Sequence, residues 1–147
     1  MNTSRSTETV STALAVLRSH GLRVSTSRRL VLEALFAAGV PVTADRIATG
    51  LDGRLPPLDV ASVYRNLDTL EQLGVVRHLH PGRGPGLFAL AGSDRAEYLV
   101  CDRCGQVRAI DASLLDPVRA ALQETTAWDA RFSRFPIVGT CPACAAR

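Results

Sequence analysis

The cysteines of this 147-residue chain constrain its fold more than any other feature of the sequence. There are four, in two pairs that each enclose two residues: Cys101 with Cys104, and Cys141 with Cys144. Two such pairs, separated by 36 residues, have the spacing of a tetrahedral zinc site in which each turn supplies two thiolates. Four protein ligands close a site to water. We therefore expect one structural zinc ion per subunit, tying two distant stretches of chain together.

Disulfides and redox chemistry are the alternatives for these cysteines. Disulfides belong to secreted chains, but the first ten residues are polar and lack the apolar segment of a signal peptide. No apolar run approaches the roughly 18 residues of a membrane span. We therefore expect a reducing, cytoplasmic location and no membrane partner. A redox-active motif of this kind requires one pair of cysteines and not two.

The positive charge of the chain lies in its N-terminal part. Residues 1–86 contain ten arginines and seven acidic residues, whereas residues 87–147 contain seven of each. A basic excess of this kind favours a polyanionic partner, although a solvated basic face would have the same composition.

Four helices and a hairpin are predicted for the N-terminal part. Apolar spacing and stop signals place the helices at 7–19, 25–38, 43–50 and 60–73. The fourth helix has Asp59 as its N-cap and a buried stripe of Val63, Leu67 and Leu70. Its other face carries Ser62, Arg65, Asn66 and Thr69.

A hairpin follows at residues 75–90, with a turn rich in glycine and proline at 81–86. Three helices, a polar-faced fourth and a hairpin follow the order of a winged helix-turn-helix, whose last helix enters the major groove of DNA. A generic small helical domain with a hairpin has the same order.

The C-terminal part is predicted to be a small αβ module. Strands at 97–100 and 106–110 flank the first cysteine pair, and a strand at 131–138 leads to the second. Between them, Asp116 and Pro117 have the pattern of an N-cap followed by proline. The helix that they start has Val118, Ala121 and Leu122 on its inner face. A module of about 60 residues needs its metal and a partner subunit to be stable. The predicted class is thus α+β: an N-terminal winged helix-turn-helix domain and a C-terminal αβ dimerisation domain with a four-cysteine zinc site.

Five segments together carry a family resemblance. They are Gly21–Arg28, Thr43–Ile47, Ala61–Leu67, Tyr98–Gly105 and Gly139–Cys144. Over about residues 14–145 the chain resembles the ferric uptake regulator family of metal-dependent bacterial repressors. The resemblance implies a homodimer that binds inverted-repeat operators and represses genes of metal homeostasis or stress. It also implies a winged-helix DNA-binding domain at 1–82, a hinge at 83–86 and a dimerisation domain at 87–147.

The resemblance assigns DNA contacts to individual residues. Tyr64 would contact a base, Arg65 would bind phosphate, and Ser62 lies near enough to the helix start to help. Arg23 and Arg28 match basic positions that the family places against the DNA backbone or in the minor groove. The alternative for both arginines is ordinary solvated surface.

The second metal site of the family is where this sequence departs from the pattern. Family members sense metal near the hinge through histidines, but the stretch before Cys101 contains none, and one usual histidine position holds Pro41. The family's carboxylate position in the dimerisation helix falls on Asp116, which also has the pattern of a cap.

Two histidines remain as candidate ligands of a second metal. His78 and His80 alternate along a predicted strand and so share a face, and Glu97 or Asp94 could add a carboxylate. Such a set suits Zn, Ni, Fe or Mn as an effector. The alternative is a pair of solvated histidines in the hairpin.

Three functions remain open at this point. The first is a metal-responsive repressor. The second is a family member that has lost metal sensing and acts constitutively or responds to a redox or other signal. A metal-binding protein without a DNA role is disfavoured by the Val63-Tyr64-Arg65 helix. The sequence shows no nucleophile–base pair, phosphate loop or open zinc motif, so we do not expect an enzyme.

Overall fold

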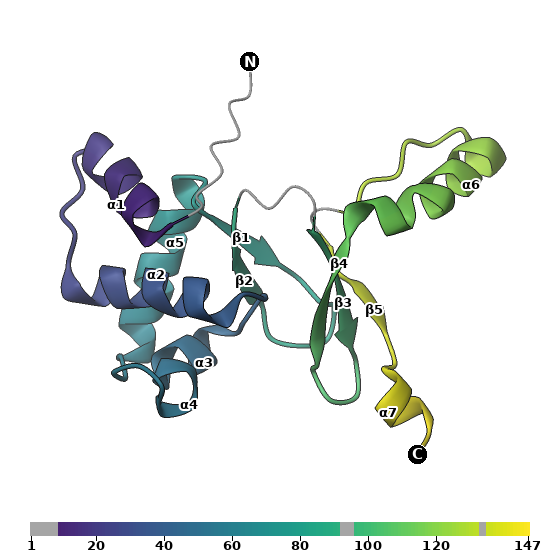
Figure 1. Cartoon of the computed structure of the whole chain (residues 1–147). Coiled ribbons are helices and arrows are strands. Elements are labelled where there is room, and N and C mark those ends of the chain that lie inside the picture. The colour runs from purple at the N-terminus through teal and green to yellow at the C-terminus, as the bar shows by residue number, and fades with distance from the viewer. Residues whose placement is uncertain (1–8, 92–95, 133–134) are drawn as a thin grey trace. The chain divides into compact units, whose positions relative to one another are not determined.

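The chain divides into two units that interleave along the sequence. A loop at residues 79–85 belongs to the second unit, and the strand that follows it belongs to the first. The computed structural model describes residues 9–91, 96–132 and 135–147. The first unit contains residues 1–78 and 86–92, and the second contains residues 79–85 and 93–147. Figure 1 shows the elements in chain order. Strand β2 (Leu87–Leu90) pairs with β1 (Val76–Leu79) and belongs with the helices. The first unit therefore extends past the segment 83–86 that we expected to separate the domains.

The four helices expected in the first unit are present, although the first begins at Val10 instead of residue 7 and the third ends at Ala48 instead of residue 50. They are α1 (Val10–Ser19), α2 (Thr26–Ala38), α3 (Ala44–Ala48) and α5 (Val60–Gln72). The residue before each one, Thr9, Ser25, Thr43 or Asp59, accepts a hydrogen bond from a backbone N–H of the first turn. Each cap satisfies one of the amide groups that a helix start leaves unpaired.

The core of the first unit is formed by the inward faces of these helices. Its fully buried side chains include Leu17, Val31, Leu32, Ile47, Val63, Leu67 and Leu70. The expected stripe of α5 is thus confirmed. The hairpin joins this core through an antiparallel bridge between Val42 and Phe88.

A short helical turn, α4 (Gly50–Gly53), lies where we expected a break in the chain. Leu51 has a positive φ of 54°, and its side chain is completely buried in the core. A left-handed residue of this type costs roughly 1–2 kcal/mol, whereas burying a leucine gains about 1.5–3 kcal/mol. Burial of Leu51 therefore offsets the cost of its own backbone conformation.

The second unit is built on a three-stranded sheet in the order β4-β3-β5. The central strand β3 (Ala96–Cys101) pairs antiparallel with β4 (Val107–Asp111) and parallel with β5 (Ile137–Gly139). Cys101 lies opposite Gly139 in this register, two residues before Cys141. The sheet therefore brings the two cysteine pairs together.

The helix after β4 differs in two respects from the prediction. A 3₁₀ turn, η1 (Ala112–Leu115), precedes α6 (Asp116–Thr126), so the N-cap of α6 is Leu115. Asp116 is therefore the first helical residue, and the expected cap was wrong. The acidic cap belongs to Asp111, which accepts a hydrogen bond from the Ser113 N–H at 2.9 Å.

The described residues do not cover the predicted inner face of α6. No residue of α6 is buried, and Val118 and Leu122 are 46% and 37% exposed. Strand β5 is also shorter than the expected 131–138; of that range, residues 133–134 lie outside the described residues. The last helix, α7 (Pro142–Ala145), carries the final cysteine. Within the parts of the chain that the structure describes, no helix is long and apolar enough to cross a membrane.

Candidate metal centre and nucleic-acid interface

The four cysteines form one cluster in the second unit. Their sulfur atoms all lie within 4.8 Å of one another, and all four are free thiols. Zinc–sulfur bonds of about 2.3 Å in a tetrahedron place neighbouring sulfurs about 3.8 Å apart. The Sγ atoms of Cys104 and Cys141 are 3.8 Å apart. The cluster is therefore close to the geometry of a tetrahedral zinc site, and zinc is the metal that this set of four thiolates favours.

Backbone hydrogen bonds hold the two cysteine turns in place. Cys101 is buried at the end of β3, and its N–H donates to the Gln106 carbonyl at 2.9 Å. The N–H of Asp102 donates to the Gly139 carbonyl at 2.9 Å, and Arg103 donates to the Cys144 carbonyl at 3.1 Å. The last two bonds connect the first turn to the second independently of any metal.

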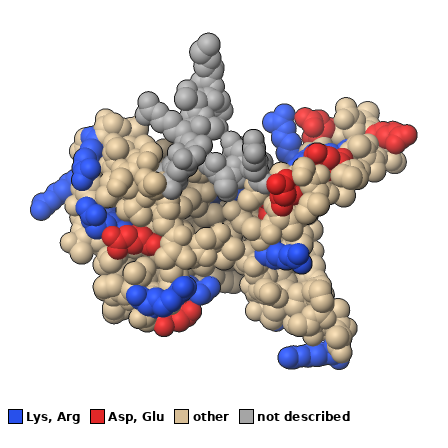
Figure 2. Space-filling model, in the orientation of Figure 1, with Lys and Arg blue, Asp and Glu red and all other residues tan. Residues whose placement is uncertain are grey.

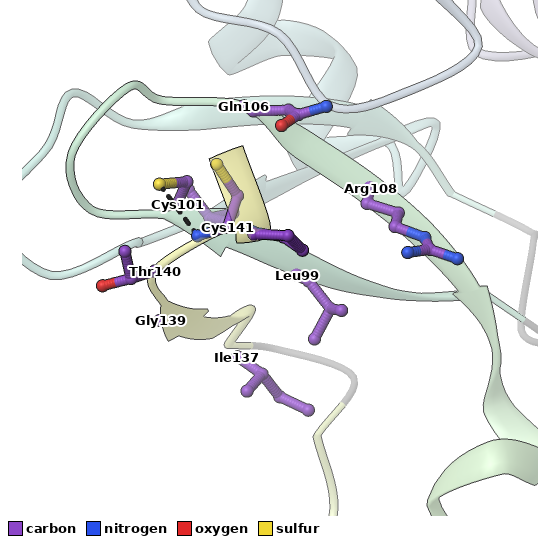
Figure 3. A pocket seen from close by; sticks show the side chains of 10 residues that line it. Leu99, Cys101, Gln106, Arg108, Ile137, Gly139, Thr140 and Cys141 are labelled. Carbon is purple, nitrogen blue, oxygen red and sulfur yellow. Dashed lines mark hydrogen bonds between the residues drawn. The ribbon is translucent and has the colours of Figure 1, made fainter. Parts of the chain in front are cut away.

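The thiols of the cluster differ in acidity. The Cys141 N–H donates to Cys101 Sγ at 3.3 Å, as Figure 3 shows, and this bond is the main reason why the pKa of the Cys101 thiol falls to about 6. The pKa of Cys144 is raised to about 12, chiefly through its hydrogen bond with the Cys141 side chain. In the cluster, ionisation of Cys101 is therefore favoured and ionisation of Cys144 is disfavoured. A bound Zn²⁺ would supply the positive charge that stabilises all four thiolates.

Beside the cluster, one face of the sheet is hollowed into a pocket with a volume of about 210 Å³. Figure 3 shows Leu99 and Ile137 projecting side by side from β3 and β5, with Arg108 on β4. The three positions form one row, because Leu99 is paired with both Arg108 and Ile137. Among the described residues, Leu99 and Ile137 are half-buried and Arg108 is exposed, so this row combines two apolar side chains with one charged side chain.

Helix α5 presents polar side chains on the face opposite its buried stripe. Tyr64 is 46% exposed, Arg65 is exposed, and Ser62 is half-buried in the first turn. The Asp59 carboxylate accepts from the Ser62 N–H at 2.9 Å and fixes the start of the helix. A rigid helix with an exposed tyrosine and arginine near its start can contact base edges and phosphates in a DNA groove.

Asn66 does not lie on this exposed face, contrary to the prediction. It is 6% exposed, and its side-chain amide donates to the Ser62 carbonyl at 2.9 Å and to Ser27 Oγ at 3.4 Å. Its Oδ1 accepts from Arg28 Nε at 3.0 Å. Asn66 is therefore a buried polar connection between α5 and the start of α2.

The predicted basic positions have different surroundings. The guanidinium of Arg28 is half-buried and also donates from Nη1 to the Arg23 carbonyl at 2.7 Å. Arg23 itself is exposed. Figure 2 shows several arginines on the visible face of the helical unit, with fewer acidic side chains among them.

The candidate ligands of a second metal have other partners. The ring of His78 stacks on Phe88 with 4.4 Å between centroids, and a Cβ at Gly86 would collide with its Nε2. Its Nδ1 lies 4.0 Å from the Glu71 carboxylate. Glu97 is buried and paired with Arg119 in the second unit. His80 is exposed after β1, and Asp94 lies outside the described residues. Among the described residues, the cysteine cluster is the one group of three or more potential ligands.

Comparison with known proteins agrees with this architecture. The sequence model described as the ferric uptake regulator family matches residues 19–132. The peroxide operon regulator of Bacillus subtilis is 31% identical over 132 residues, which cover 90% of each chain. The chain belongs to the ferric uptake regulator family. It is therefore a transcriptional regulator of the class that binds DNA and metal, and the expected family and fold class are confirmed.

Other members of the ferric uptake regulator family give the same picture. The peroxide-responsive repressor PerR of Staphylococcus epidermidis is 28% identical, covering 90% of this chain and 87% of its own. The solved ferric uptake regulator of Helicobacter pylori shares the fold, with a TM-score of 0.71 at 18% identity, covering 93% of this chain and 94% of that one. The description of that structure reports three functional metal-binding sites in the Helicobacter protein.

Sequence reasoning missed two residues that shape these sites in this family member. Asn66 was placed on the outer face because helical periodicity does not show that a polar side chain can be buried against another helix. Arg119 carried no motif signal. Its distance of three residues from Asp116 was the available clue, since side chains at that spacing meet on a helix.

Proposed function

We propose that the chain is a homodimeric repressor that binds inverted-repeat operators through α5, with a structural zinc ion in each second unit. The observation that carries this proposal is the exposure of Tyr64 and Arg65 on a helix whose opposite face is fully buried. Tyr64 would contact bases and Arg65 phosphate, with Ser62 near the backbone. Two such helices related by a two-fold axis match two half-sites of an inverted repeat.

The apolar surface of the second unit supports a second copy as its partner. Leu114, Val118 and Leu122 on η1 and α6 are exposed, and so are Trp128, Phe135 and Val138. Exposed apolar clusters of this kind mark protein interfaces. Since the described residues of one chain bury no residue of α6, a partner subunit is the cover that we assign to this helix. We therefore assign the second unit, with strand β2 excluded, to dimerisation.

Among the basic residues, Arg23 and Arg28 have different proposed roles. Arg23 is exposed and suits a contact with the DNA backbone. Arg28 uses Nε and Nη1 within the protein, so we assign it to orienting α5 against α2.

Selection from a pool of random duplexes tests the proposed DNA role. The zinc-loaded chain is expected to enrich an inverted repeat. The Tyr64→Ala variant, altered at an exposed side chain, should retain the fold but lose the enrichment. Enrichment of the same sequence by both proteins would contradict the assignment of Tyr64, and no enrichment by either would contradict the proposed function.

A second divalent metal is the first candidate for the effector that controls operator binding. His78 and His80 remain the candidate ligands of a second divalent metal, Zn, Ni, Fe or Mn. Replacing both by Ala should abolish any metal-dependent step in operator binding. Metal dependence that survives the double substitution would remove these histidines from the sensing role.

A redox signal is a second candidate, favoured by the exposure of Cys104 in the zinc cluster. Hydrogen peroxide would oxidise two thiolates to a disulfide, take up two protons and be reduced to water, releasing the zinc ion. The names of two relatives refer to peroxide. Zinc released into a chromogenic chelator in step with loss of operator binding would support this alternative, and retention of zinc under peroxide would exclude it.

A further inference from the structure

The guanidinium of Arg119 pairs with two acidic side chains of the second unit, Glu97 and Asp116. Its Nη2 lies 3.1 Å from Glu97 Oε1 on β3, and its Nη1 lies 2.8 Å from Asp116 Oδ1 at the start of α6. Nη1 also donates to the Ala112 carbonyl at 2.9 Å. The Phe132 ring completes the site, with its centroid 5.6 Å from the guanidinium carbon.

Two converging carboxylates and a backbone carbonyl are the oxygen donors that a divalent cation takes in proteins. Here a protein cation already holds all three oxygens. Glu97 is the only acidic residue that is buried in the described part of the chain, with 9% of its side chain exposed, so its charge needs a compensating partner. The planar guanidinium matches this geometry because its donors diverge in one plane.

The same contacts determine what holds α6 beside the sheet. No residue of α6 is buried, so apolar packing within the chain does not fix its position. Arg119 links α6 to β3 through Glu97, and to η1 through the Ala112 carbonyl. Besides the buried Leu115 at the N-cap of α6, these Arg119 contacts tie the helix that presents Val118 and Leu122 to the sheet.

We propose that Arg119 is a built-in cation that replaces a divalent metal between Glu97 and Asp116, so that this part of the second unit is ordered without an effector ion. The inference rests on the proposed function only in linking α6 to dimerisation. It removes Glu97 from the candidate metal ligands and leaves His78 and His80 unaffected.

Binding of Mn²⁺, followed by the loss of its free-ion paramagnetic resonance signal, tests this directly. The zinc-loaded wild type is expected to bind no Mn²⁺ through Glu97. Arg119→Gln exposes both carboxylates to the ion and should gain a Mn²⁺ site. That site should disappear in the Arg119→Gln, Glu97→Gln double variant. Arg131→Gln is the matched control, because the Arg131 side chain is 82% exposed and, among the described residues, its ion pair is with the exposed Asp129 at 3.4 Å.

Thermal unfolding at a fixed protein concentration provides the second readout. Arg119→Gln should unfold at a lower temperature than Arg131→Gln, and millimolar Mn²⁺ should raise the midpoint of Arg119→Gln but not of the wild type. If Arg119→Gln does not fold, the comparison of wild type with Glu97→Gln still decides. Mn²⁺ binding by the wild type that is lost in Glu97→Gln would overturn the proposal. Mn²⁺ binding that persists in Glu97→Gln belongs to a site without Glu97 and is consistent with the proposal.

Neither readout contains DNA, so the proposed function and this inference fail separately. A wild-type chain that binds no duplex would contradict the first alone. An Arg119→Gln variant that matches Arg131→Gln in both Mn²⁺ binding and thermal midpoint would contradict the second alone.

Discussion

Arg28 on α2 donates a hydrogen bond from Nε to Oδ1 of Asn66 on α5, at 3.0 Å. Asn66 is buried on a helix whose other face presents Tyr64 and Arg65. The bond therefore connects the proposed DNA-reading face to the rest of the helical unit. A hydrogen bond to a charged group contributes about 1.5–3 kcal/mol, and leaving a buried donor unpaired costs a similar amount.

Replacing Asn66 by Leu should lower the free energy of unfolding by about 1–3 kcal/mol, because Nε of Arg28 loses its acceptor while the side-chain volume is kept. Urea unfolding measures this change. Thr69→Ala is the control on the same helix, since Thr69 is half-buried and its hydroxyl donates only to the Arg65 carbonyl. Equal stability of the two variants would show that the Arg28–Asn66 bond does not hold α5.

The salt dependence of operator binding separates positioning from phosphate contact. Arg65→Ala should reduce the slope of log K against log salt by about one unit per subunit, because one phosphate contact is lost. Arg28→Ala should weaken binding through the orientation of α5 and leave the slope unchanged. An equal reduction of the slope in both variants would place Arg28 on the DNA backbone.

Loss of zinc should unfold the second unit and leave the helical unit folded. Cys141→Ser removes the ligand whose N–H also supports Cys101. Structural zinc provides on the order of 10 kcal/mol of apparent binding free energy in small modules, which is comparable to the whole stability of a typical domain. Zinc content by mass spectrometry should fall from one ion per subunit to near zero, and the helical signal of α2 and α5 should remain in circular dichroism.

Dimerisation through α6 can be tested at its apolar positions. Leu122→Asp should shift the chain from dimer to monomer in sedimentation, because a charge on a buried interface is costly. Glu124→Ala, at an exposed polar position of the same helix, is the control and should leave the mass unchanged. A Leu122→Asp variant that remains a dimer would move the interface away from α6.

The predictable parts of this molecule are those with strong local signals. Caps such as Ser25 and Asp59, the stripe of Val63, Leu67 and Leu70, and the cysteine spacing all depend on neighbouring residues or on fixed ligand geometry. The zinc cluster was predictable because four thiolates at this spacing have few other uses.

The less predictable parts depend on distant partners. Asn66 is buried because Arg28, 38 residues earlier, provides a hydrogen bond, and periodicity alone does not reveal such a pair. Asp116 had the pattern of a cap, but the 3₁₀ turn before it shifts the helix start and directs its carboxylate to Arg119. Strand β2 pairs with β1 across a turn. This pairing places β2 in the first unit, although its residues follow the expected hinge in the sequence.

The mass of the complex formed with a selected inverted-repeat duplex tests the central claim most directly. The zinc-loaded chain at low salt should form a complex of whole dimers on the duplex, and a duplex with one scrambled half-site should bind more weakly. A complex that contains a single subunit, or no complex with any duplex at low salt, would contradict the account of this chain as a homodimeric operator-binding regulator.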